Sequence, residues 1–116
     1  MAIQATNVTT AGNIVYTSSG NTVVTFLSLC NYASGNASPV TANIFIVPNN
    51  GGSVGTPSNT NIAITSLEIQ SGNLAAGGDT YQFYVGNEKL ILSNNDTIYA
   101  NCTANTLTAI VSYTSA

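Results

Sequence analysis

Apolar and polar residues alternate along most of this chain in short runs, and each run is bounded by Asn, Gly, Ser or Pro. Runs of this kind, rich in Val, Ile, Thr and Tyr, are typical of β-strands. No window keeps the i, i+3, i+4, i+7 apolar stripe of an amphipathic helix. The pattern predicts strands at residues 14–17, 22–32, 40–47, 61–70, 79–85, 89–92, 97–103 and 107–113.

Several of these runs have one apolar face, as expected for a strand with one buried side. The predicted inward residues are Val40, Ala42, Ile44, Ile46, Ile98, Ala100, Cys102, Leu107, Ala109, Val111 and Tyr113. The run 22–32 is apolar on both faces, so we expect it to lie centrally in a sheet or to bury its second face against a partner. In the run 61–70 the apolar phase switches near Thr65 and Ser66, which predicts a bulge or bend.

Seven or eight short strands with short connections predict an all-β fold, an antiparallel β-sandwich of the jelly-roll-like or Ig-like kind. We expect one sandwich domain over residues 14–116. Residues 1–13 lack a strong pattern and are expected to form an N-terminal arm or edge segment, which either pairs with a neighbouring molecule or frays. Residues 48–60 are the longest polar stretch and predict an exposed loop.

Charged residues are scarce in this chain of 116 residues, at 4% of the total, against roughly a quarter in ordinary soluble domains. Low charge weakens repulsion between molecules and favours permanent assembly, although an uncharged secreted or thermally robust monomer is an alternative. With a single basic residue, Lys89, the chain lacks the cations that nucleic acid or anionic lipid would require, so we expect neither nucleic acid nor membrane as a partner.

Targeting signals are also missing from the pattern. No apolar run approaches the roughly 20 residues that cross a bilayer, and residues 1–4 lack the basic start of a signal peptide. We therefore expect assembly in a cytoplasm and read the Asn-x-Ser/Thr triplets as by-products of composition.

The inventory of reactive side chains is poor. Because the chain has no His, catalytic triads and imidazole metal sites are impossible, and two cysteines cannot complete a zinc sphere. A carboxylate pair is the one acid-base mechanism left. Asp79 and Asp96, however, each follow turn residues and precede Thr, which is the position for side-chain-to-backbone turn bonds. A calcium site at Asp96 lacks the spacing of a calcium loop. We expect no enzyme, no metal and no cofactor.

Cys30 and Cys102 fall on the second and the penultimate predicted strands, where Ig domains place their bridge between sheets. The core Trp that accompanies that bridge is missing, since the chain has no Trp. We therefore favour two small buried thiols that stay reduced.

Aromatic residues on or beside the strands are candidates for protein contacts, because Tyr combines apolar area with a hydrogen-bonding group. The interface candidates are Tyr16, Tyr32, Phe26, Tyr84 and Tyr113. Packing inside the domain is the alternative for each, and we expect it for about half of the tyrosines.

The segments 23–31, 40–48, 74–81, 88–98 and 109–113 together show a familiar order of strands and turns. In that order the chain resembles the small Ig-like or jelly-roll-like virion proteins of tailed bacteriophages, over residues 14–114. The resemblance lies in strand and turn positions and carries no catalytic motif. It implies a capsid decoration (cement) protein located in the virion, a homotrimer bound to the major capsid protein. The alternative is a tail, baseplate or fibre component that binds a host protein or glycan through the loop 48–60.

Overall fold

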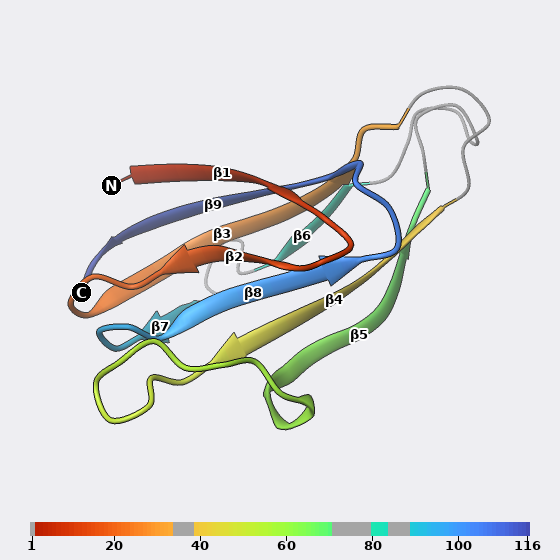
Figure 1. The fold of residues 1–116 in the computed structure, drawn as a ribbon. Coiled ribbons are helices and arrows are strands. Elements are labelled where there is room, and N and C mark those ends of the chain that lie inside the picture. Colours follow the sequence, from red (N-terminus) through yellow and green to blue (C-terminus); the bar gives the residue numbers. More distant parts are fainter. Residues whose placement is uncertain (1, 34–38, 71–79, 84–88) are drawn as a thin grey trace.

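In the computed structural model, which describes residues 2–33, 39–70, 80–83 and 89–116, two antiparallel sheets pack face to face (Figure 1). The described residues form nine strands and one short 3-10 turn. These elements are β1 (Ala2–Val8), β2 (Asn13–Thr17), β3 (Thr22–Asn31), β4 (Val40–Val47), η1 (Asn59–Asn61), β5 (Ile62–Ile69), β6 (Thr80–Phe83), β7 (Leu90–Leu92), β8 (Thr97–Cys102) and β9 (Leu107–Ser115).

The strands divide between two sheets in a non-sequential order. The first sheet has the order β1-β9-β3-β6, and β7 pairs with a further part of β3; the second has the order β2-β8-β4-β5. Every pairing is antiparallel. The predicted antiparallel β-sandwich is therefore confirmed, and β3 lies centrally in its sheet as its two apolar faces indicated.

Strand β1 is the element that the sequence pattern did not predict. It pairs with β9 over seven residues, from Ala2 opposite Tyr113 to Val8 opposite Leu107. Of the two forms expected for residues 1–13, the edge segment is the one observed, because Ala2–Val8 is an edge strand of its own sheet and does not fray. The signal was weak because most of β1 is exposed, and only its last residue, Val8, is fully buried.

The core lies between the two sheets and is built from alternate strand residues. Its largest fully buried side chains are Leu27, Leu29, Ile44, Ile69, Ile98, Leu107, Val8, Val15, Val24, Val40, Val47 and Val111. Most of the alternation predicted for residues 40–47, 97–103 and 107–113 is confirmed, although Ile46 and Tyr113 are only partly buried against the core. Among the described residues, no buried side-chain nitrogen or oxygen lacks a hydrogen-bond partner.

The bulge predicted near Thr65 and Ser66 is present in β5. The pairing of β4 with β5 shifts register between Ala42 and Ile44, and Ser66 adopts a left-handed backbone with φ of 55°. The side chain of Asn43 holds the bulge, since its Oδ1 accepts hydrogen bonds from Ser66 N and Thr65 Oγ1, both at 3.0 Å. An irregular edge of this kind discourages strand pairing with another molecule.

Candidate functional site

The outer face of the first sheet carries a group of apolar side chains that the core does not use. Since Ala109 and Val111 face the core, Ile110 between them faces away. Antiparallel register places Ile110 beside Ala5 and Ser28, and it places Ser112 between Ile3 and Phe26. Val23 lies opposite Ile91 near the start of β3. We call the face formed by Ile3, Ala5, Val23, Phe26, Ile91 and Ile110 the outer apolar face.

This outer apolar face is partly open to solvent, since Ile3, Ala5 and Ile91 are exposed whereas Val23, Phe26 and Ile110 are half-buried. Ile3 is 73% exposed and Ile91 is 69% exposed, which is high for large aliphatic side chains. No Asp, Glu, Lys or Arg occurs in any strand of this sheet. Of the other outward side chains, Ser112 is half-buried and offers a hydroxyl group, whereas Ser28 is only 6% exposed. A neutral face of this composition can be covered by another protein without removing a charge from water.

The outer face of the second sheet is different, because polar contacts and a loop occupy it. Asn43 Nδ2 donates a hydrogen bond to Asn101 Oδ1 at 2.9 Å. Phe45 packs edge to face against Tyr99, with ring centroids 5.6 Å apart, and is only 8% exposed. The loop after β4 folds back over this end of the sheet, so that Gly55 lies against Pro48 and Val47. The two outer faces are therefore not equivalent.

The sequence-predicted interface residues divide among several places. Phe26 lies on the outer apolar face, half-buried. Tyr32 is 53% exposed at the end of β3, and its hydroxyl lies 2.6 Å from Asn7 Oδ1. Tyr16 and Tyr113 are brought together, with ring centroids 4.2 Å apart. Tyr84 lies outside the described residues.

Among the members of the outer apolar face, only Phe26 was a sequence candidate, and sequence reasoning missed Ile3, Ala5, Val23, Ile91 and Ile110. A signal for Ile110 was present, because it interrupts the polar face of a strand whose other face is fully apolar. Ile91 likewise interrupts a polar face, since it lies between Lys89 and Ser93 on the side of the strand opposite Leu90 and Leu92. Ile3 could not be assigned to a face, because no strand was predicted for residues 1–13 and no alternation of inward and outward side chains was available.

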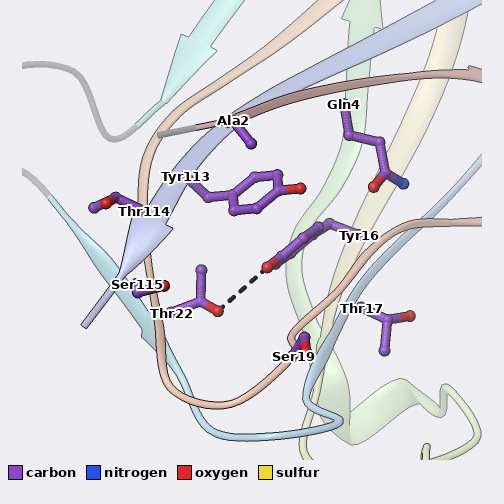
Figure 2. A pocket seen from close by; sticks show the side chains of 9 residues that line it. All are labelled: Ala2, Gln4, Tyr16, Thr17, Ser19, Thr22, Tyr113, Thr114 and Ser115. Atoms are coloured by element: carbon purple, nitrogen blue, oxygen red, sulfur yellow. Dashed lines mark hydrogen bonds between the residues drawn. The ribbon is translucent and has the colours of Figure 1, made fainter.

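A pocket of about 390 Å³ lies between the edges of the two sheets (Figure 2). Its walls are the start of β1, the end of β2, Ser19 in the following turn, Thr22 at the start of β3, and residues 113–115 of β9. The sheet edges are held together above it, since Gln4 Nε2 donates a hydrogen bond to Val15 O at 2.9 Å. Tyr16 and Tyr113 project into the space between the walls (Figure 2).

The predicted turn role of Asp96 is confirmed. Its Oδ2 accepts a hydrogen bond from Ser93 N at 2.8 Å, and its Oδ1 accepts one from Asn49 N at 2.7 Å. The carboxylate thereby ties the β7–β8 turn to the loop that follows β4. Asp79, for which the same role was predicted, lies outside the described residues.

The two cysteines are free and lie on opposite layers. Cys30 is half-buried on the outward side of β3, opposite Thr108. Cys102 faces the core from β8, and burial raises the pKa of its thiol above the ordinary value. Its Sγ lies 2.9 Å from Ala104 O. Both thiols are unbridged as expected, but the expectation that both are buried is wrong for Cys30, which faces outward.

Among the described residues, no group of three or more His, Cys, Asp or Glu is arranged to hold a metal ion. No helix in the same part of the chain is long and apolar enough to span a membrane.

Comparison of the chain with protein-family models, with curated proteins and with solved structures gave no match. The functional assignment therefore depends on the features of the molecule described above.

Proposed function

We propose that this protein is a structural component of a bacteriophage particle, a capsid decoration protein that binds the major capsid protein and associates with itself, as a homotrimer. The outer apolar face carries the proposal, because it is a partly exposed sheet surface with no charged residue in its strands. The order of strands and turns, which resembles that of small virion proteins, supports the same class.

The outer apolar face has the chemistry of a protein contact. Large apolar patches are uncommon on proteins that remain solitary in solution. Covering Ile3, Phe26 and Ile110 with protein would release water from aliphatic and aromatic surface. The intervening hydroxyl group of Ser112 can keep a hydrogen bond to a partner or to trapped water. Binding here therefore needs no charge complementarity.

Such contacts stabilise a shell by mass action. A protein that binds the assembled shell and not its separated subunits lowers the free energy of the assembled state. A decoration protein acts in this way without any chemical step, which is consistent with contact residues that are aliphatic, aromatic and hydroxylic.

The proposal is tested by adding a charge to the outer apolar face. We expect Ile110→Lys and Ile91→Lys to reduce binding to particles of the encoding virus at least about tenfold, because a buried unpaired charge costs several kcal/mol. The matched control is Val54→Lys, since Val54 is 44% exposed on the loop over the other sheet. Sedimentation velocity should show an oligomer for the wild-type protein. A monomer that is absent from purified particles would contradict the proposal.

A second candidate function is a tail, baseplate or fibre component that binds a host receptor through the loop 48–60. The loop is held in one shape: Asn95 Nδ2 donates to Gly52 O at 2.7 Å, and Asn50 forms a bridge with Ser53. It presents Val54 to solvent. Under this candidate Val54→Lys would abolish adsorption to host cells and spare particle stability, which is the reverse of the result expected above.

A further inference from the structure

We propose that the pocket between the sheet edges binds a neutral saccharide. The pocket is separate from the outer apolar face, so this inference does not depend on the proposed structural role. Its volume of about 390 Å³ falls within the range of roughly 300–1,000 Å³ that is usual for small-molecule sites.

The lining chemistry defines the ligand class. Eight of the nine lining side chains carry a hydroxyl or an amide, Ala2 being the exception, and none carries a charge. A phosphate or carboxylate ligand would find no cation there, and a metal ion would find no carboxylate. An apolar ligand would leave the Tyr113 hydroxyl without a partner, which is costly. A neutral polyol matches them, because each of its hydroxyls both donates and accepts.

The two tyrosines supply the apolar part of the site. The partly buried ring of Tyr113 presents an aromatic surface, on which the C–H face of a sugar ring can pack. The ring of Tyr16, which is only 4% exposed, lies against it with the ring centroids 4.2 Å apart. The Tyr16 hydroxyl is already engaged, since it lies 3.2 Å from Thr22 Oγ1, which in turn accepts a hydrogen bond from Ser18 Oγ at 2.8 Å. Tyr16 is therefore held in place by Thr22, and its ring supports the ring of Tyr113.

Tyr113 is the residue best placed to bind a ligand. Among the described residues its hydroxyl has no hydrogen-bond partner. Figure 2 shows this hydroxyl pointing across the pocket toward the side where Gln4 lies. A ligand hydroxyl between these two side chains would gain a bond to the phenol and another to the free amide oxygen of Gln4, whose Nε2 is held by Val15 O.

The pocket is formed before any ligand binds. Gln4 fixes β1 against β2, as described above. At the other end, Ala116 N donates a hydrogen bond to Asn21 O at 2.9 Å and so fastens the end of β9 beside the start of β3. A preformed site loses little conformational entropy on binding.

The experiment is a titration of the full chain with neutral sugars, in which binding is monitored by the amide chemical shifts in two-dimensional NMR spectra. The probes are glucose, galactose, mannose, N-acetylglucosamine and their disaccharides, with inorganic phosphate in parallel. We expect at least one sugar to give saturable shifts confined to residues 2–4, 16–22 and 113–115. Shifts produced by phosphate alone, or by no sugar up to its solubility limit, would overturn the proposal.

Two variants test whether binding occurs in this pocket, and a third variant serves as the control. Tyr113→Phe keeps the ring and removes the free hydroxyl, so the dissociation constant should rise about two- to tenfold, the worth of one hydrogen bond. Ser19→Trp fills the mouth from an exposed turn position and should abolish binding. Tyr81→Phe removes a hydroxyl from β6, far from the pocket in the sheet order, and should have no effect. The spectrum of each variant reports whether it is folded, and unchanged binding in Ser19→Trp would exclude this pocket.

Discussion

The rings of Tyr16 and Tyr113 stack across the sandwich with their centroids 4.2 Å apart and their planes 34° from parallel. Tyr16 belongs to β2 in the second sheet, and Tyr113 belongs to β9 in the first. Two side chains from opposite ends of the sequence therefore join the layers at the same place where they border the pocket.

This contact should be measurable as a coupling free energy. In a double-mutant cycle with Tyr16→Leu and Tyr113→Leu, we expect the two losses of unfolding free energy to be non-additive by about 0.5–1.5 kcal/mol, the usual worth of an aromatic pair. Urea unfolding supplies the values. The control cycle combines Tyr16→Leu with Tyr32→Leu, because Tyr32 bonds to Asn7 and Asn105 instead. That cycle should be additive, and equal couplings in the two cycles would refute the role of the stack.

Gly12 should resist substitution more strongly than a glycine with the same backbone conformation elsewhere. Its φ is +90°, and a Cβ built on it would collide with the ring and hydroxyl of Tyr99. Gly52, with φ of +89°, has open space around it. Each substitution by Ala costs the left-handed backbone penalty of about 1 kcal/mol, and only Gly12→Ala adds the collision. Thermal unfolding should therefore show a clearly lower Tm for Gly12→Ala, and equal shifts would contradict this account.

The Asp96 carboxylate should contribute strongly to stability for a residue near the surface. It accepts hydrogen bonds from Ser93 N and Asn49 N, and a third from Asn49 Nδ2 at 3.2 Å. We expect Asp96→Ala to lower the unfolding free energy by about 1.5–3 kcal/mol, the range for hydrogen bonds to a charged group. The control is Glu68→Gln on the exposed side of β5, which should change stability by less than about 0.5 kcal/mol. A loss for Asp96→Ala no larger than that of the control would show that the turn does not need the carboxylate.

The sequence predicted most of the fold because the buried strands alternate so regularly. Residues 40–47 were delimited correctly from Val40, Ala42, Ile44 and Ile46, since a half-buried strand exposes every second side chain. The edge strand β1 was not predicted, because an exposed strand does not show the alternation of apolar and polar residues. Its place is determined by pairing with β9, and that long-range contact leaves no mark in the local pattern.

The candidate sites were less predictable than the fold. Phe26 was identified as a contact residue because its strand is apolar on both faces, and it does lie on the outer apolar face. Tyr16 and Tyr113 were chosen as separate interface residues, whereas their contact with each other depends on how the sheets pack. A pocket formed by two sheet edges arises from tertiary structure alone, so no spacing of residues in the sequence predicts it.

The two thiols should differ in reactivity. Cys102 is buried and its pKa is raised, so little thiolate forms at mildly alkaline pH, whereas Cys30 is only half-buried on the outward side of β3. With iodoacetamide we expect Cys30 to be alkylated first, and Cys102 to react at a comparable rate only in urea. Peptide mass spectrometry distinguishes the two. The experiment uses dilute protein, because association through the outer apolar face would also shield Cys30.

The raised pKa of Cys102 also predicts how stability depends on pH. Because burial disfavours the thiolate, the folded protein holds this proton more tightly than the unfolded chain does. The thiol therefore contributes its full stability below the unfolded pKa of about 8.5, and the contribution is lost as pH rises through the folded pKa. Between about pH 7 and about pH 9.5, the unfolding free energy of the wild-type protein should fall more than that of Cys102→Ala, which has no proton to lose at this position. The comparison cancels the titration of the tyrosines, since both proteins contain them all. Equal pH slopes in urea unfolding would mean that Cys102 ionises as readily in the folded core as in water.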